Sequence, residues 1–182
     1  MRIAKIPRER IIIFGQSMGT FVASAVAEHY AKEGVEFAGL VLVAGFTDLP
    51  GLLDTYALAG YIAPLAPIRR YPKLTNLLTS RLVDTWPTAE RLAGFVRTSK
   101  RVRLSILHAL DDREIPWIQS QRLFATAANA TTDGGMDIHL IEGTKARNTV
   151  DFGDGTFICT WKTGDNKIIR QQVIGYGGEL LL

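Results

Sequence analysis

The chain is poor in the residues that form disulfides or bind metals. It has one cysteine, Cys159, among 182 residues, which excludes an intramolecular disulfide. Cys159 lies in an apolar run, where a small buried side chain is far commoner than a catalytic thiol. The three histidines lack metal-ligand spacing, and no glycine-rich phosphate loop is present. We therefore expect no metal, nucleotide or other cofactor.

Long apolar runs and a strong charge are missing as well. The nearest approach to a membrane span, residues 52–68, is broken by two prolines, a glycine and Asp54, and falls short of the roughly 18 apolar residues needed. The basic segment 1–10 lacks the apolar stretch of a signal peptide. The net charge is only +3, from scattered lysines and arginines. We expect no membrane span and no nucleic-acid partner, and the compartment stays open.

What is present is a pattern of strands that alternate with helices. This pattern favours a single α/β domain with a parallel sheet and right-handed crossovers. Between Thr47 and Lys100 the chain is rich in proline and aromatic residues, and several short helices are expected there. Predicted strands are 11–14, 37–44, 101–109 and 136–142, predicted helices are 18–32 and 115–130, and a hairpin of 150–162 with 167–174 turns at 163–166.

The strongest local motif is Gly15-Gln16-Ser17-Met18-Gly19, which fits the pattern G-x-S-x-G. It follows a strand that we expect to be fully buried, and it opens a helix with a face of small residues, which is the context of a nucleophile elbow. Glycines at 15 and 19 would remove clashes in the tight turn. Ser17 is then the nucleophile, and the backbone N–H of Met18 at the helix N-terminus can stabilise an oxyanion. The alternative is a serine that only caps the helix.

A serine nucleophile needs a base, and the base needs an orienting acid. In hydrolases with this elbow the chain order is serine, acid, histidine. Asp112 follows the predicted strand 101–109 and precedes a predicted helix, so we expect it at the catalytic edge of the sheet. Asp111 is then its neighbour or a helix cap, and Asp48, just past the second strand, is a weaker rival.

Three segments resemble the α/β-hydrolase family, namely 14–30, 40–46 and 104–116. The stretch from His108 to Pro116 is similar to the signature histidine-glycine-x-x-aspartate-x-x-valine-proline, with Asp112 in the aspartate position. The abhydrolase-domain serine hydrolases are the nearest group, in their monoacylglycerol and lysophospholipid lipase branch. The resemblance implies a partial α/β-hydrolase fold with a helical cap at about 47–100 and a C-terminal hairpin at about 150–175. It also implies a lipid-like ester substrate and, for the parent protein, a possible membrane association.

The family's histidine follows the last strand, and here that position holds Glu179 in Tyr176-Gly177-Gly178-Glu179. A carboxylate does not easily replace an imidazole that must accept and return a proton near neutral pH. Of the histidines present, His29 lies far along the helix after the elbow, and His108 corresponds to a structural position of the family. His139 alternates with apolar residues in a predicted strand.

Only ten residues precede the first predicted strand, whereas the family places its elbow after the fifth strand of about eight. The resemblance therefore implies the C-terminal half of the fold, without the loop that carries the second oxyanion donor and with exposed apolar strand edges. We expect a hydrolase fragment that is impaired or inactive as written. The alternative is a non-catalytic relative that binds a lipid-like ligand or a protein partner.

Overall fold

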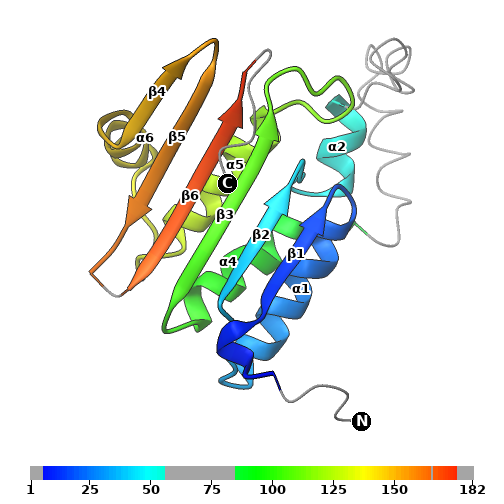
Figure 1. Ribbon diagram of the computed structural model, residues 1–182, viewed down its shortest axis with the longest axis vertical. Helices are drawn as coiled ribbons and strands as arrows, with labels where there is room; N and C mark the ends of the chain where they lie inside the picture. Colours follow the sequence, from blue (N-terminus) through cyan, green and yellow to red (C-terminus); the bar gives the residue numbers. More distant parts are fainter. Residues whose placement is uncertain (1–5, 56–84, 165, 176–182) are drawn as a thin grey trace.

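A computed structural model describes residues 6–55, 85–164 and 166–175. In this part of the chain one mixed sheet has the strand order β1-β2-β3-β6-β5-β4, and helices lie against it (Figure 1). The strands are β1 (Ile12–Gln16), β2 (Gly39–Val43), β3 (Val102–Ala109), β4 (Thr149–Gly153), β5 (Thr156–Lys162) and β6 (Lys167–Ile174). The helices are η1 (Arg8–Arg10), α1 (Gly19–Lys32), α2 (Leu49–Thr55), α4 (Thr88–Thr98), α5 (Ile118–Asn129) and α6 (Ile138–Arg147).

The strands β1, β2, β3 and β6 are parallel neighbours. Helix α1 connects β1 to β2, and α4 leads into β3, as the alternating pattern predicts. β6 enters the sheet from the hairpin and pairs with β3 over its whole length, from Val102 opposite Lys167 to Ala109 opposite Ile174. The fold is α/β, and this arrangement fits a partial α/β-hydrolase fold.

The core lies between the sheet and the helices behind it. Leu42, Ile106 and Ile169 point from three neighbouring strands into this layer and are fully buried. Helix α1 contributes its small-residue face through Ala23 and Ala27, which confirms the expected close packing. Figure 1 shows α1, α4 and α5 on one face of the sheet, while no helix of the described residues covers the other face.

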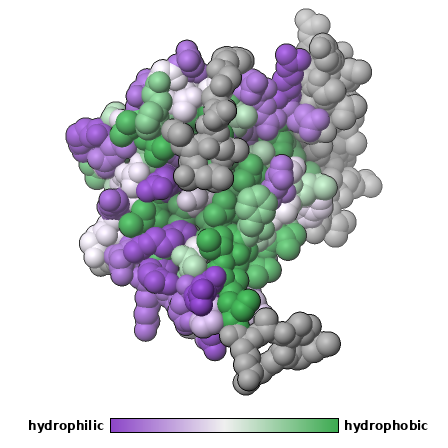
Figure 2. All heavy atoms as spheres, viewed as in Figure 1, coloured by the Kyte–Doolittle hydropathy of each residue, from purple (hydrophilic) through white to green (hydrophobic). Residues whose placement is uncertain are grey.

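Strand β1 is not fully buried, contrary to the prediction. Ile12 is 60% exposed and Phe14 is 61% exposed, because β1 is an edge strand and its outward face carries no helix in the described part of the chain. Met18 and Val22, where α1 begins, are exposed as well. Figure 2 shows hydrophobic residues gathered over this side of the sheet. An apolar edge of this kind is unusual in a parallel sheet, whose strands are normally covered on both faces.

The strand predicted at 136–142 is wrong, because residues 138–142 form the start of α6 and Asp137 is its N-cap. Asp137 caps the helix by accepting a hydrogen bond from the backbone N–H of His139 at 2.7 Å. So short an alternating run does not distinguish a strand from a helix, and here the capping aspartate favours the helix.

The C-terminal hairpin has one more strand than predicted. The turn between Lys162 and Lys167 joins β5 and β6 as expected. The range 150–162, however, holds both β4 and β5, joined by a turn at Asp154 and Gly155. Both turn residues have positive φ angles, of 52° and 79°, which are typical of the tight turns of hairpins.

Helices α2 and α4 fall within the range expected for a cap. Helix α4 packs against α1, and its Leu92 and Val96 are fully buried, so it belongs to the layer that covers the sheet. Residues 56–84, the middle of the expected cap, lie outside the described residues. The cap therefore stays a prediction, now restricted to the part of the chain before Thr88.

Candidate active site

Four parallel strands bring their C-terminal ends to one edge of the sheet. Ser17 follows β1, Asp48 lies beyond β2, Asp112 follows β3, and Gly175 follows β6. Ligands and catalytic residues of open α/β sheets gather at this edge. At a strand spacing of about 4.8 Å, the ends of β1 and β3 lie roughly 10 Å apart.

Ser17 occupies a sharp turn between β1 and α1. Its φ angle is 51°, a left-handed conformation that is uncommon for a residue with a side chain. Its N–H donates to the carbonyl of Val43 on β2 at 2.9 Å, and its carbonyl accepts from the Thr20 hydroxyl at 2.6 Å. The turn is therefore tied both to the neighbouring strand and to the first turn of the helix.

The two glycines of the motif differ in what they contribute. A Cβ atom at Gly15 would meet the Gly19 carbonyl oxygen at 2.5 Å and the Ala23 Cβ at 2.7 Å, so no larger residue fits there. A Cβ atom at Gly19 would meet nothing within 4 Å. The steric reason expected for both glycines thus holds for Gly15 and is wrong for Gly19.

Met18 stands at the N-cap position of α1, with its side chain 58% exposed. The first N–H groups of a helix have no intrahelical acceptor, and they carry the positive end of the helix dipole. The N–H of Met18 is thus one of the donors available beside Ser17 for an anionic oxygen.

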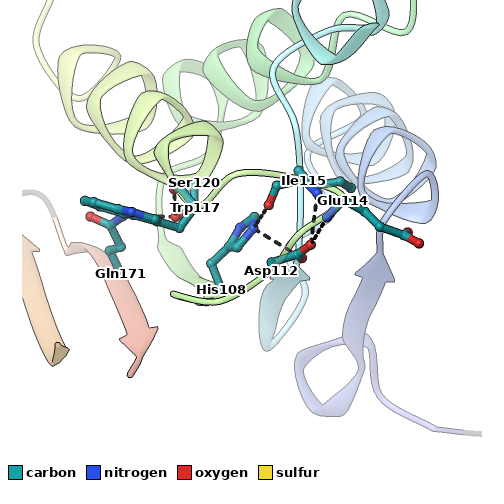
Figure 3. Close-up of polar contacts among 7 residues, drawn as sticks. All are labelled: His108, Asp112, Glu114, Ile115, Trp117, Ser120 and Gln171. Carbon is teal, nitrogen blue, oxygen red and sulfur yellow. Dashed lines mark hydrogen bonds and ion pairs between the residues drawn. The ribbon is translucent and has the colours of Figure 1, made fainter. Parts of the chain in front are cut away.

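The Asp112 carboxylate is held in place by three neighbours (Figure 3). Its Oδ1 accepts from the N–H groups of Glu114 at 3.0 Å and Ile115 at 2.9 Å, and its Oδ2 lies 3.5 Å from Nε2 of His108. Burial raises the pKa of Asp112, but the contact with His108 and the two backbone bonds together lower it below its usual value. The carboxylate is therefore ionised at neutral pH, as an orienting acid must be.

The His108 side chain contacts the loop that carries Asp112. Its side chain is buried, and Nε2 lies 2.7 Å from the Ile115 carbonyl oxygen, an acceptor that requires this nitrogen to carry a proton. Nδ1 has no hydrogen-bond partner among the described residues. His108 points toward Asp112 and Ile115, so its geometry agrees with the structural position implied by the family resemblance.

The other histidines lie away from this edge. His29 is in the last turn of α1, about 15 Å of helix rise beyond Gly19, and pairs with Glu33 at 3.3 Å. His139 is exposed in the first turn of α6, a helix that packs against β5. No histidine of the described residues is therefore placed to serve Ser17. Glu179, in the expected histidine position, falls outside them.

The rival acid Asp48 caps helix α2. Its Oδ1 accepts from the N–H of Gly51 at 2.6 Å. The loop around it is anchored by Gln119, a fully buried side chain of α5 whose Oε1 accepts from the N–H and hydroxyl of Thr47 at 3.2 and 3.0 Å. Sequence reasoning missed Gln119, because nothing in its local pattern distinguishes it from a surface glutamine.

The described residues contain no group of three histidine, cysteine, aspartate or glutamate side chains arranged to hold a metal ion. None of the helices in this part of the chain combines the length and the apolar character needed to cross a membrane.

Comparisons with known proteins give a distant likeness only. No model of a known protein family matches the chain, and no curated protein does. Among solved structures, the uncomplexed acylaminoacyl peptidase of Pyrococcus horikoshii matches with 16% identity and a TM-score of 0.41. An orthorhombic crystal form of the same peptidase matches with 15% identity and the same TM-score. Each match covers 68% of this chain but only 18% of the peptidase.

Proposed function

We propose that this chain is part of a serine hydrolase that cleaves carboxylic esters, and that as written it is impaired or inactive. The observation that carries the proposal is the turn at Ser17. A left-handed serine stands between a strand and a helix, over a glycine that cannot be replaced without a clash. This combination of strain and close packing is characteristic of a nucleophile elbow.

In the intact enzyme the Ser17 hydroxyl attacks the carbonyl carbon of the ester while a histidine takes its proton. The N–H of Met18 stabilises the oxyanion that forms, and Asp112 holds the imidazole in the required tautomer. The proton then passes from the histidine to the leaving alcohol, and an acyl-enzyme results. Water releases the acid by the same steps in the second half-reaction.

The impairment follows from the residue at position 179. Glutamate cannot act as the imidazole does, because it is already ionised and only weakly basic at neutral pH.

The exposed side of β1 supports the view that further polypeptide belongs to this domain. Ile12 and Phe14 on the strand, and Val22 on the helix behind it, present apolar surface to solvent. Additional strands beside β1 would pair the backbone edge that is unpaired among the described residues, and helices on the open face would cover Ile12 and Phe14.

Esters with a lipid-like acyl chain are the proposed substrates, in keeping with the monoacylglycerol and lysophospholipid lipase branch. The support is the apolar and aromatic composition of the segment between Thr47 and Thr88, which precedes the sheet-covering helix α4.

Labelling with a fluorophosphonate, which modifies activated serines, tests the proposed function. We expect the probe to label the isolated chain no more than it labels the Ser17→Ala variant, which lacks the hydroxyl. Ser105→Ala, a change on the open face of β3, serves as the matched control. Strong labelling that Ser17→Ala abolishes and Ser105→Ala leaves unchanged would show that the chain is an active hydrolase.

The second candidate is a non-catalytic relative that binds a lipid-like ligand or a protein partner. It is favoured by the same lack of a histidine near Ser17 among the described residues. The genomic sequence on both sides of the reading frame separates the two. Coding sequence for upstream strands and a downstream histidine supports the enzyme fragment, whereas its absence together with a stable product supports the binding protein.

A further inference from the structure

The face of the sheet that no described helix covers is not equally exposed everywhere. On β1, Ile12 is 60% exposed and Phe14 is 61% exposed, as expected for an uncovered face. In the middle of the sheet, however, Leu107 of β3 is only 8% exposed and Gln172 of β6 only 6%. These two residues lie opposite each other in the register of β3 and β6. Part of this face is therefore covered, although no described helix lies there (Figure 1).

Both side chains belong to the open face because their neighbours in sequence point the other way. Ile106 is part of the core beneath the helices, and Gln171 donates to the Ser120 hydroxyl of α5 at 3.1 Å. Successive side chains of a strand point to opposite faces and stand roughly perpendicular to the sheet. Neighbours in the same row therefore shield the flanks of Leu107 and Gln172 but leave their tips open. Burial of the tips requires atoms above the sheet.

The amide group of Gln172 indicates what kind of material the cover is. Its Nε2 is buried and has no hydrogen-bond partner among the described residues. A buried donor is costly to leave unpaired, and most side-chain hydrogen bonds go to the backbone or to water. A stretch of polypeptide over this position supplies carbonyl acceptors, which a purely apolar ligand does not. The cover that fits best is therefore a segment of polypeptide.

The charge of the open face limits which segment fits. Arg103, Lys162 and Arg170 lie on this face, and none of the described strand residues that share it is acidic. Arg103 is held by Asn166, to which it donates at 2.7 and 3.1 Å. Arg170 makes no ion pair with any described residue. The face therefore favours a segment that is apolar and carries negative rather than positive charge.

Residues 176–182 have this character and follow β6 directly. Their sequence is Tyr-Gly-Gly-Glu-Leu-Leu-Leu, so Glu179 is their only charged side chain. Gly175 lies three positions past Gln172, or about 10 Å along the strand. Seven residues can span up to about 23 Å, and two adjacent glycines permit a reversal of the chain. The three leucines can therefore reach Leu107 and Gln172.

The other long segments outside the described residues match the face less well. Residues 56–84 contain four basic side chains and one acidic side chain, and residues 1–5 contain two basic side chains and no acidic one. Either segment would bring positive charge beside Arg170. Residues 176–182 instead offer a charge of the opposite sign together with apolar side chains.

We propose that residues 180–182 fold back over the open face of the sheet and dock on Leu107 and Gln172. The leucines cover the side chain of Leu107, and a backbone carbonyl of the segment accepts from Nε2 of Gln172. Docking also holds residue 179 beside the ends of β3 and β6, where the family has its histidine. This consequence rests on the proposed function, whereas the docking itself does not.

The reactivity of an introduced thiol in the full chain tests the docking. Gln172→Cys places a thiol at the covered position. Val150→Cys is the matched control, because it lies in the same row of the open face, on β4, and is 57% exposed. The parent chain, whose Cys159 is fully buried, gives the background. We expect dithionitrobenzoate to modify Gln172→Cys about tenfold more slowly than Val150→Cys, because modification requires local opening of the cover.

Removing the leucines then identifies the cover. Leu180→Ser, Leu181→Ser and Leu182→Ser in one chain should speed modification of Gln172→Cys about tenfold and leave the rate of Val150→Cys unchanged. An unchanged rate at Gln172→Cys would overturn the proposal. Protection that persists at every protein concentration would then show that another segment covers this position, and protection lost on dilution would show that a second copy does.

A nitroxide label on Leu181→Cys tests the same contact without altering the sheet. We expect it to broaden the backbone amide NMR signals of Leu107 and Gln172, and to leave that of His29, at the far end of α1, sharp. Sharp signals at Leu107 and Gln172 would contradict the docking. Neither measurement uses the chemistry of Ser17, so the docking can fail while the proposed function stands, and the reverse.

Discussion

Two strand–turn–helix units of this molecule supply the proposed catalytic residues, and they differ in how they are packed. Strand β3 lies between β2 and β6, and its Leu104 and Ile106 are buried. Within the described residues strand β1 pairs only with β2, and on its open face Ile12 is 60% exposed and Phe14 is 61% exposed. Both units nevertheless form a tight turn at the same edge. The conformation of a site residue is thus set by its own turn. The burial of its strand depends on the sheet face, since Leu104 and Ile106 face the helices whereas Ile12 and Phe14 face the open side, and on the strands that flank it.

The largest expected contrast is between a core residue of β3 and an edge residue of β1. Ile106→Ala removes a fully buried side chain and should lower the free energy of unfolding by about 3 kcal/mol. Phe14→Ala, at a mostly exposed position, should cost about 1 kcal/mol or less. Urea unfolding of both variants measures the difference. Similar losses would mean that the outer side of β1 is covered in solution, and would contradict an open edge.

The next contrast lies within the elbow itself. Gly15→Ala places a methyl group against backbone and side-chain atoms of α1 and should lower the free energy of unfolding by about 2 kcal/mol. Gly19→Ala places the same group in open space at the start of a helix, where alanine is favourable, so the change should stay within about 0.5 kcal/mol. Chemical unfolding of the pair shows which glycine the turn requires. Equal sensitivity at the two positions would refute the steric account of the elbow.

A smaller effect is expected at the acid. Asp112→Asn removes the charge that the backbone N–H groups and His108 stabilise, and should cost about 1 kcal/mol at pH 7. The pKa of Asp112 is lowered in the folded chain from its usual 3.8, so this contribution is complete above that value. This stabilisation is lost as the pH falls through the lower pKa that Asp112 has in the folded chain. Below that pH the free energies of unfolding of the variant and the parent chain should converge. Asp111→Asn, at an exposed residue, is the control, and a gap that persists in acid would contradict the role of the charge.

Much of this arrangement can be predicted from the sequence because it depends on local patterns. The strand before Ser17, the helix after it and the strand before Asp112 have clear apolar periodicity and turn residues. Parallel topology then brings Ser17 and Asp112 to one edge, since the strands that precede them run in the same direction.

What the sequence does not reveal depends on tertiary contacts. The exposure of Ile12 and Phe14 follows from the open face of the sheet and from the edge position of β1 in the described residues, and the apolar run of residues 11–14 does not indicate either. The sequence predicts a strand where α6 begins, because the first residues alternate between apolar and polar as in a strand. In the structure Asp137 caps a helix there. Gln119 and Glu28 are buried polar residues that each have a partner more than 60 positions away, Thr47 for Gln119 and Arg91 for Glu28. Such partners leave no local signal.

We propose that Ser17 and Asp112 are positioned as nucleophile and acid, and that no histidine of the described residues serves them as a base. The most direct measurement is the rate of fluorophosphonate labelling at Ser17 in the parent chain, in Glu179→His and in Glu179→Gln, with Ser17→Ala as background. We expect background labelling in the parent chain and in Glu179→Gln. In Glu179→His the rate of labelling should rise about 10²-fold, which is the lower end of the rate increase that a general base contributes. Background labelling in Glu179→His, or rapid labelling of the parent chain, would contradict this proposal.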